Sequence, residues 1–513
     1  MEPVNHQSPN RVHHLLAPWL ASQPDALALR DATLSLSYGA LEQKSDDMAN
    51  RLAQAGVRPG DRVLIVGENC VALCVLFLAL SKLDAWTIVV NARLSGREID
   101  QFIEHSGARR VLYLCHVSED ARSHSQRHGA TDLPSDLGDI AIGAQASNVT
   151  AEPCFPDPAQ QVAAMVYTSG TTGSPKGVML THANLMFVAQ SARDVRRLTP
   201  DDVIYGVLPM AHVVGLSTQF LGAICSGATL ILEPRFAPQS TLRALAEDRV
   251  TIFTGVPALF ARVLEWTRAN GMALVAPQLR LISVAGSPLT PSLKADIERA
   301  FKLPLQNGYG LTETAPTIAQ TRLEAPRTDC SVGPAIPGVE LRVVNADGAE
   351  VPCGVTGELH VRGPGVMKGY YRNAALTSSV LDPNGWFNTG DMANIDAEGA
   401  LFISGRTKEL IIRSGFNVYP LEVEQVLNAY PGVVQSAVVG REAHHNEEIV
   451  AFLETKAGAD IDMRALREYL RDSLSPYKQP TDIRFMEALP SAPNGKVLKN
   501  TLKELARTAP AKT

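Results

Sequence analysis

An alternation of amphipathic helical stretches and short apolar runs, which begins near Leu36, constrains the fold of this chain more than any other feature. The apolar runs lie at 62–67, 85–90, 109–115, 228–234, 249–255 and 279–286. Each run is followed by a stretch with helical periodicity, and strands that are separated by helices form parallel sheets. The polar tract 118–160 divides the runs into two blocks. The pattern therefore predicts two sheets of the parallel α/β type.

The pattern changes after residue 331. Apolar runs at 339–345, 357–363 and 400–405 have few helical residues between them, which indicates an antiparallel or barrel-like unit. From residue 409 onward, strands and helices mix again in a compact α+β unit. We predict an α/β protein with a large N-terminal domain, residues 1–405, which holds two parallel-type sheets and a small β-barrel subdomain. A small C-terminal α+β domain is predicted over residues 406–513.

Composition excludes several classes of protein. The chain has 513 residues, too many for one hydrophobic core, and a formal net charge of -6, which argues against a broad nucleic-acid-binding surface. The most apolar run, 71–80, is roughly half the length of a membrane-spanning helix and is better interpreted as a buried helix. The seven cysteines are scattered without a CxxC pair, which predicts reduced thiols and a cytoplasmic location. The oligomeric state is left open.

Residues 167–178, YTSGTTGSPKGV, combine three glycines, five hydroxyls of Ser and Thr, and Lys176. Glycines allow backbone N–H groups to converge on an anion, and a lysine adds a mobile positive charge. The spacing differs from that of a Walker A loop. A flexible linker is the alternative, but the run lies between an apolar segment, 162–166, and what resembles the start of a helix. We predict a polyphosphate-binding loop whose candidate ligands are Thr168, Ser169, Gly170, Thr171, Thr172 and Lys176.

A second motif, NGYGLTET at 307–314, flanks Tyr309 with two glycines, so that the backbone can approach a flat ligand. Thr312 adds a hydroxyl. Glu313 adds a carboxylate of the kind that Mg²⁺ binds together with phosphate oxygens. The alternative interpretation of this motif alone is a turn with a solvated glutamate.

Further motifs lie nearer the C-terminus. WFNTGD ends at Asp391, whose carboxylate is suited to accept two hydrogen bonds from a ribose diol at a turn. GRTKELIIRSG carries Arg406, Lys408 and Gly415, and APNGK ends at Lys496. Read singly, these motifs are an ordinary turn, a charged surface strand and a solvated lysine.

Taken together and in this order, the five motifs resemble those of the adenylate-forming superfamily of acyl-CoA synthetases, aryl-CoA ligases, luciferases and peptide-synthetase adenylation domains. The resemblance covers nearly the whole chain and implies ATP, Mg²⁺ and CoA as co-substrates. The implied roles are ATP binding by Gly308, Tyr309, Gly310, Thr312, Asp391, Arg406 and Lys496, metal binding by Glu313 and Thr168, and catalysis by Lys496, Lys176, Glu313 and His212. It further implies a mobile C-terminal domain with a hinge at Lys408 and a CoA tunnel at Gly415.

The resemblance implies a two-step reaction in which a carboxylic acid is converted to acyl-AMP and then transferred to the thiol of CoA. The implied acyl pocket is largely apolar, which favours a medium-chain aliphatic or aryl acid; its residues are His212, Val256, Ala285, Gly286, Ala315 and Pro316. A malonate-type dicarboxylate is the alternative substrate, with Arg262 as the ligand of the distal carboxylate. The context of Lys496 also resembles a site of lysine acetyltransferases.

Three other functions are weighed against this one. Residues 208–216, LPMAHVVGL, resemble the family motif that supplies His212 at the gate of the acyl pocket. An amino-acid-activating domain would need an aspartate beside this motif, which has none. A luciferase-like monooxygenase is compatible with the motifs but is a rare activity on this scaffold. A non-catalytic nucleotide-binding regulatory protein would be expected to lack some of the polar catalytic residues, all of which are present.

Overall fold

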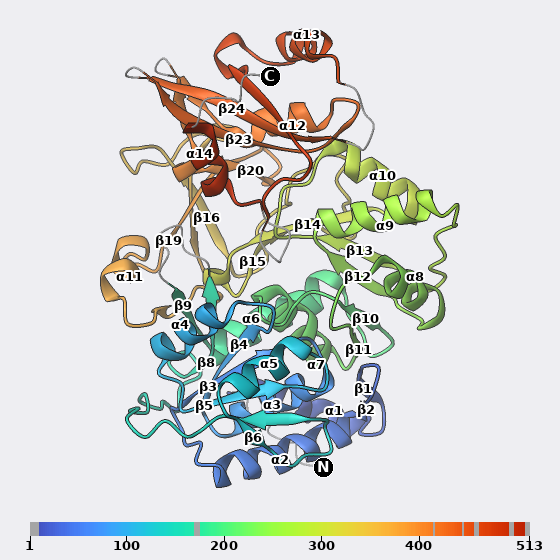
Figure 1. The fold of residues 1–513 in the computed structure, drawn as a ribbon, viewed down its shortest axis with the longest axis vertical. Coiled ribbons are helices and arrows are strands. Elements are labelled where there is room, and N and C mark those ends of the chain that lie inside the picture. The colour runs from blue at the N-terminus through green and yellow to red at the C-terminus, as the bar shows by residue number, and fades with distance from the viewer. Residues whose placement is uncertain are drawn as a thin grey trace.

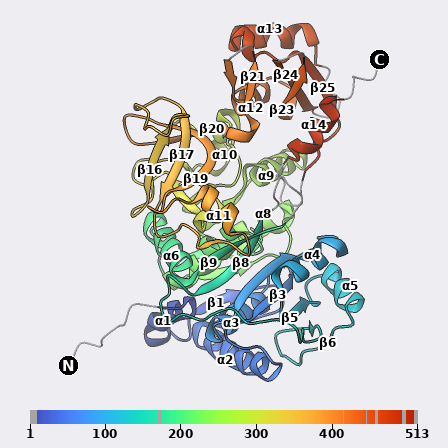
Figure 2. The same ribbon diagram turned by 90° about the vertical axis from the view of Figure 1, so that its left-hand side faces the viewer.

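The computed structural model describes residues 10–168, 175–413, 416–443, 446–455, 461–491 and 497–507. Two eight-stranded sheets form the larger part of the molecule, and the remaining sheets follow toward the C-terminus (Figure 1). The view turned by 90° places the C-terminal elements at the end of the molecule opposite the first helices (Figure 2). This arrangement confirms the predicted α/β fold class.

The first sheet has a parallel centre that is extended by antiparallel strands. In sheet order its strands are β18 (Gly369–Tyr370), β9 (Lys176–Thr181), β8 (Val162–Thr168), β4 (Trp86–Asn91), β3 (Arg62–Gly67), β5 (Arg110–Leu114), β7 (Ile140–Ile142) and β6 (Thr131–Asp132). The helices of this part are α2 (Tyr38–Gln54), α3 (Val71–Lys82), α4 (Gly96–Ser106) and α5 (Glu119–Arg127). Helix α4 begins with a capping box between Ser95 and Glu98 and ends at Gly107, whose φ is 57°.

The second sheet is parallel from β11 to β14. In sheet order its strands are β15 (Thr317–Gln320), β14 (Leu305–Gly310), β13 (Leu281–Val284), β12 (Ile252–Gly255), β10 (Val203–Gly206), β11 (Thr229–Leu232), β1 (Leu27–Arg30) and β2 (Ser35–Ser37). Its helices are η1 (Val12–Leu16), α1 (Ala17–Ser22), α6 (His182–Arg196), η2 (Val214–Leu221), α7 (Gly222–Ser226), α8 (Pro238–Glu247), α9 (Pro257–Ala269), α10 (Pro291–Phe301) and η3 (Thr312–Thr314). The predicted runs 228–234, 249–255 and 279–286 correspond to β11, β12 and β13, whereas β1 and β2 join this sheet from a part of the chain before the first predicted run.

Helix α3 is buried on all sides between the two sheets. Every residue from Val71 to Ser81 is buried, and the ring of Phe77 packs edge to face against Phe220 of η2 with centroids 5.8 Å apart. A helix without a polar face must be enclosed by protein or lipid. Among the described helices, none combines the length and the apolar character needed to span a bilayer. The prediction of a buried helix over 71–80 is therefore correct.

A four-stranded antiparallel sheet occupies the place of the predicted small barrel. Its strands are β16 (Glu340–Val344), β17 (Gly357–Arg362), β19 (Phe387–Ile395) and β20 (Leu401–Arg406), and α11 (Ala374–Val380) lies beside it. In the described residues, β16 and β20 do not pair with each other to close a ring. Instead Leu401 exchanges backbone hydrogen bonds with Val332 and Gly333, and Ala335 bridges to Ala319 of β15, so that this sheet is linked to the second large sheet.

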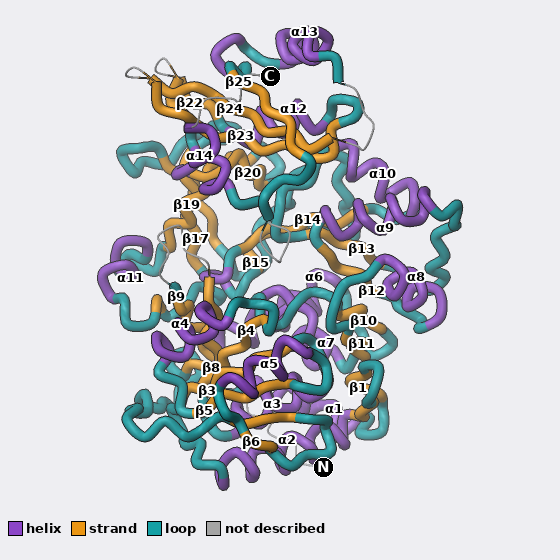
Figure 3. The backbone as a smooth tube through the Cα atoms, viewed as in Figure 1, coloured by secondary structure: helices purple, strands orange, loops and turns teal. Residues whose placement is uncertain are grey.

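The C-terminal part has its own core. Its elements are η4 (Thr407–Glu409), β21 (Ile411–Arg413), β22 (Phe416–Val418), α12 (Pro420–Asn428), β23 (Val433–Ala443), β24 (Asn446–Thr455), α13 (Met463–Ser473), η5 (Pro476–Lys478), β25 (Asp482–Met486) and α14 (Lys499–Arg507). Helices cover both faces of the sheet: α12 and α13 share one hydrophobic cluster with it, and α14 shares another (Figure 3). This is the predicted α+β unit.

Candidate active site

The predicted site residues follow the carboxyl ends of parallel strands in both large sheets. In such sheets ligands bind outside the carboxyl ends of the strands. Strands β10, β12, β13 and β14 are parallel neighbours, so the residues that follow them lie at one edge. The predicted residues at this edge are His212 after β10, Val256 after β12, Ala285 and Gly286 after β13, and Gly308, Tyr309 and Gly310 at the end of β14.

The glycine-rich run joins two antiparallel strands, which corrects the prediction that it leads from a strand into a helix. Strand β8 pairs with β9, and Thr168 lies opposite Lys176 in the register. The pairing with β8 extends to Thr181, and α6 begins only after this residue, which caps it. The predicted ligands Ser169, Gly170, Thr171 and Thr172 lie outside the described residues.

Tyr370 lies between Lys176 of β9 and Glu313 of η3 and contacts both. Strand β18 pairs with β9 so that Tyr370 is opposite Val178, and the Lys176 Nζ lies 5.8 Å from the centroid of the tyrosine ring. The hydroxyl of Tyr370 donates a hydrogen bond of 2.8 Å to Glu313 Oε1. This tyrosine was not selected from the sequence. The predicted phosphate ligand Thr312 adjoins Glu313 in η3 and is half-buried.

Tyr309, Asp391 and Arg406 form a second polar cluster. The Tyr309 hydroxyl donates to Asp391 Oδ2, and Arg406 Nε lies 3.3 Å from Asp391 Oδ1. Burial and the negative charge of Asp391 hold the pKa of Tyr309 well above its usual value, so the phenol stays a hydrogen-bond donor. Asp391 lies within β19, after Gly390 with a φ of 69°, rather than at the turn that the sequence predicts. Strand pairing places it directly opposite Arg406.

Gly310 is required by a close approach of the backbone. A Cβ added at this position would lie 1.9 Å from the carbonyl oxygen of Pro316. Pro316 lies between η3 and β15. The residue before it, Ala315, has a positive φ of 67°, which is rare for residues other than glycine. The contact brings the predicted acyl residues Ala315 and Pro316 against the end of the predicted adenine motif.

On the acyl side, the predicted residues meet at the sheet edge without polar contacts between their side chains. Val256 caps the start of α9 and is half-buried, and Ala285 is half-buried beside it. Gly286 is exposed with a φ of 85°, and the only atom within 4 Å of a Cβ added there is Val256 Cγ1, at 3.7 Å. Arg262 is exposed on α9, where it faces away from the buried side of that helix.

Asn69, which sequence reasoning missed, ties the two sheets together at this edge. Its Nδ2 donates to the carbonyl oxygens of Gly206 and Leu208, at 3.1 and 2.9 Å, and its Oδ1 accepts from the N–H of Met210 at 2.8 Å. The segment that leads to His212 is thereby fixed to the end of β3. The signal in the sequence that could have predicted Asn69 is the polar pair Glu68–Asn69 directly after the buried parallel strand β3.

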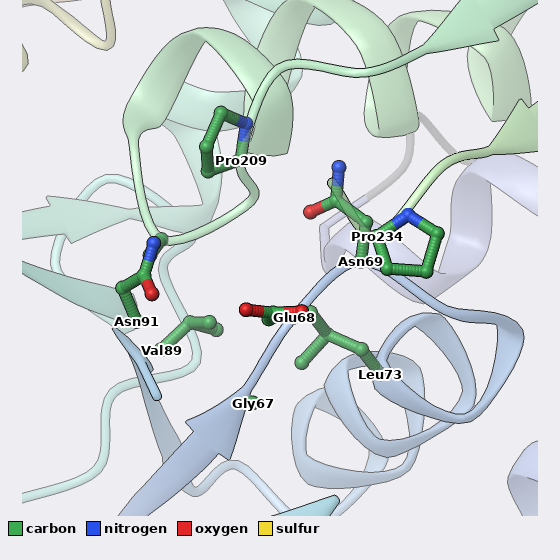
Figure 4. A pocket seen from close by; sticks show the side chains of 9 residues that line it. Gly67, Glu68, Asn69, Leu73, Val89, Asn91, Pro209 and Pro234 are labelled. Atoms are coloured by element: carbon green, nitrogen blue, oxygen red, sulfur yellow. The ribbon is translucent and has the colours of Figure 1, made fainter. Parts of the chain in front are cut away.

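A small cleft lies next to Asn69 (Figure 4). It is lined by Gly67, Glu68, Asn69, Leu73, Val89, Asn91, Pro209, Ala211 and Pro234. Glu68 is buried and accepts hydrogen bonds on both carboxylate oxygens from Arg235 Nε, each at 2.8 Å. Arg93 lies 3.7 Å away on the other side. Two guanidinium groups therefore lie beside this buried carboxylate.

His212 directly follows Ala211, one of the residues that line this cleft. Its side chain is open to solvent, but the surrounding protein removes much of its hydration and lowers its pKa from 6.5, and the positive charge of Arg93 adds to this effect. The imidazole is therefore neutral at pH 7. A neutral imidazole can border an apolar pocket at little cost.

The C-terminal predictions are only partly described. Lys408 is exposed in η4, as a hinge residue would be, whereas Gly415 and Lys496 lie outside the described residues. Lys499, at the start of α14, is placed between Glu409 Oε2 and Glu424 Oε1, at 2.7 and 2.8 Å. Burial opposes the charge of Lys499, but the two carboxylates outweigh it and raise its pKa. This triad fixes α14 to the segment that contains Lys408.

Family models decide what kind of protein this is. A model described as "AMP-binding enzyme" matches residues 16–371, and one described as "AMP-binding enzyme C-terminal domain" matches residues 422–496.

The chain belongs to the AMP-binding enzyme family.

Individual relatives of this AMP-binding enzyme cover almost its whole length. The indoleacetate–CoA ligase of Aromatoleum aromaticum is 33% identical over an alignment of 497 residues that covers 94% of this chain and 96% of the relative. The ATP-bound structure of MatB from Rhodopseudomonas palustris aligns with a TM-score of 0.85 and 31% identity, covering 98% of this chain and 99% of that one. The O-succinylbenzoate CoA synthetase MenE from Bacillus subtilis, in complex with ATP and magnesium, has a TM-score of 0.81 and 27% identity over 96% and 99% of the two chains. The predicted superfamily is confirmed.

Proposed function

We propose that this AMP-binding enzyme is an ATP-dependent acid–CoA ligase that forms AMP. The observation that carries the proposal is the meeting of two polar clusters, Lys176–Tyr370–Glu313 and Tyr309–Asp391–Arg406, at an edge whose acyl side is apolar. Such an edge suits a nucleotide triphosphate beside a carboxylic acid. The names of the relatives, which include CoA ligases, support the same activity.

The proposed chemistry has two steps. A carboxylate oxygen of the acid attacks the α-phosphorus of ATP, the bond to the β-phosphate oxygen breaks, and pyrophosphate leaves. The thiolate of CoA then attacks the acyl carbon, and AMP leaves with the bonding electrons. Lys176 and Lys496 neutralise phosphate charge in the first step, and Asp391 with Arg406 holds the ribose. Tyr309 supplies a flat surface for adenine.

The residues present also suit Mg²⁺. Glu313 and Thr168 offer one carboxylate and one hydroxyl, the hard oxygen ligands that this ion takes in small number alongside phosphate oxygens. Bound there, the ion would offset negative charge on the phosphates. The role of this chain is to hold these oxygens in place beside Lys176.

We further propose that the domain boundary lies between residues 405 and 406 and that the C-terminal domain turns about Lys408. One orientation brings Lys496 to the phosphates for the first step, and the other brings Gly415 to the entry path of the CoA thiol for the second. Such closures are a common device of enzymes with two half-reactions. The exposure of Lys408 and the separate core of the C-terminal elements support this account.

The activity is tested by incubating the purified chain with MgATP, CoA and a panel of acids and measuring pyrophosphate and AMP. Release of ADP, or no release with any acid, would contradict the proposal and favour the non-catalytic alternative. Lys496→Ala is expected to abolish acyl-AMP formation and to spare thioester formation from preformed acyl-AMP. Lys503→Ala on α14 is the matched control, which should keep both half-reactions. Equal loss of both half-reactions in Lys496→Ala would contradict the turning domain.

For the substrate we propose a medium-chain aliphatic or aryl acid, because the acyl side is largely apolar. A dicarboxylate such as malonate is the second candidate, with Arg262 of α9 as the ligand of its distal carboxylate, although this side chain is exposed on the helix surface. Octanoate, benzoate, cinnamate and malonate are compared by AMP release in the wild type and in Arg262→Ala. A malonate activity that the variant loses would establish the dicarboxylate; activity confined to the apolar acids would exclude it.

Two proposals concern the setting of the enzyme. Acetylation of Lys496 by a lysine acetyltransferase would remove its charge and stop the first step. An acetylated protein with full activity, measured by mass spectrometry and AMP release, would overturn this regulation.

A cytoplasmic location is supported by the seven free cysteines. Fractionation of cells is the measurement that checks it.

A further inference from the structure

The segment 364–371 crosses between the two large sheets at the proposed phosphate site. Asn184 at the start of α6 donates to the carbonyl oxygens of Pro364 and Val366, at 2.7 and 2.9 Å, and so fixes the beginning of the segment. The N–H of Met367 then donates to the backbone oxygen of Glu313 at 2.8 Å. The N–H of Tyr371 donates to Gly177 at 2.8 Å. The segment therefore binds the backbones on both sides of the site.

Tyr370 is the residue of this segment whose side chain reaches both charged groups. It is buried, with 7% of its surface exposed, and its position opposite Val178 in the strand pair puts Lys176 on the same face, two residues away. Its ring lies beside the ammonium group of Lys176, and its hydroxyl donates to Oε1 of Glu313. One side chain thus spans the distance between a cation of β9 and a carboxylate of η3.

We propose that Tyr370 is a positioning residue that holds Glu313 and Lys176 ready for metal-bound ATP. The hydroxyl donates to Oε1 of Glu313, so that the carboxylate would hold a metal ion through Oε2. The ring keeps the ammonium group of Lys176 near the phosphates. This inference rests on the proposed function, because it takes Glu313 as the metal ligand. Groups that orient a metal ligand typically change metal affinity by about 10- to 100-fold.

Tyr370→Phe tests the role of the hydroxyl alone, because phenylalanine lacks the hydroxyl but keeps the ring beside Lys176. The adjacent Tyr371→Phe is the matched control: its hydroxyl donates to Glu152 Oε1 at 2.7 Å and has no contact with Glu313 among the described residues. Binding is measured by calorimetry with MgATP and with ATP in EDTA, and by the electron paramagnetic resonance of Mn²⁺ titrated in the presence of ATP. Thermal unfolding shows that each variant is folded.

We expect Tyr370→Phe to weaken MgATP and Mn²⁺ binding by roughly 10-fold or more, with metal-free ATP binding unchanged. Tyr371→Phe is expected to match the wild type in all three measurements. Wild-type MgATP affinity in Tyr370→Phe, or an equal loss with metal-free ATP, would overturn the role of the hydroxyl.

Tyr370→Leu tests the ring. Because leucine removes the partner of Lys176 as well, this variant is expected to lose affinity for metal-free ATP in addition to MgATP. If it behaves like Tyr370→Phe, the ring does not position Lys176. These results are independent of the acid substrate. A wild type that binds MgATP but forms no acyl-AMP would contradict the proposed function, while a metal-specific loss in Tyr370→Phe would still support this inference.

Discussion

On the nucleotide side of the site, side chains hold one another before any ligand is present: Tyr309 donates to Asp391, and Tyr370 donates to Glu313. On the acyl side, Val256 and Gly286 are brought together only by the backbone, and no polar bond joins them. The difference indicates that nucleotide binding depends on a few fixed charges and that acid selection depends on shape. Substitutions should therefore have sharp, specific effects on one side and graded effects on the other.

The largest effect is expected from Asp391→Asn on the nucleotide side. Asparagine keeps the size of the side chain but removes the charge that Arg406 and the proposed ribose hydroxyls share. A hydrogen bond to a charged group is worth about 1.5–3 kcal/mol, so ATP affinity should fall by roughly 10- to 150-fold. Calorimetry with ATP measures this loss, and acid KM should change little.

Asp347→Asn, on an exposed turn of the same antiparallel sheet, is the control and should bind ATP normally. If Asp391→Asn binds ATP as tightly as the wild type, Asp391 is not the ribose ligand and the contrast between the two sides weakens.

A pair of glycine substitutions compares the two sides directly. In Gly310→Ala the new Cβ would lie 1.9 Å from the backbone oxygen of Pro316, so the chain must shift, at a cost of about 1–3 kcal/mol. In Gly286→Ala the Cβ meets only Val256 Cγ1 at 3.7 Å, and the cost is the left-handed backbone, about 1–2 kcal/mol. Both variants should melt at a lower temperature.

Ligand measurements separate the two glycine variants. Gly310→Ala should weaken MgATP binding, by less than Asp391→Asn does, whereas Gly286→Ala should keep it and accept a narrower set of acids in the AMP-release assay. Equal effects of the two variants on MgATP affinity would show that the two sides are not built differently.

The smallest effect concerns pH on the acyl side. The pKa of His212 is lowered from 6.5, so between pH 7 and 8 its imidazole stays neutral and the KM for the acid should be flat. Because the unfolded chain takes up this proton more readily than the folded one, His212 lowers the free energy of unfolding as pH falls below 6.5. His212→Gln should weaken this dependence. A break in acid KM near or above pH 6.5 in the wild type, absent from His212→Gln, would contradict a neutral imidazole.

The sequence was sufficient for the fold class because short apolar runs, typical of strands, alternate with stretches of helical periodicity in the parts of the chain that form both large sheets. It was also sufficient to select Tyr309, Asp391 and Glu313, which stand in short motifs. It could not predict strand β9, because a run such as 176–181 is apolar enough for either a strand or the first turn of a helix until β8 pairs with it. Asn69 and Tyr370 were missed because their partners are distant in sequence, at Gly206 and Glu313.

Helix α3 has a consequence for how the chain is made. Its apolar surface is complete at Lys82, yet Phe220, which covers Phe77, follows much later in the sequence. A ribosome delivers the N-terminal segment first, and exposed apolar surface in incomplete chains promotes aggregation. Until η2 and the second sheet emerge, we expect nascent α3 to leave this apolar surface uncovered and the growing chain to be at its most prone to aggregation.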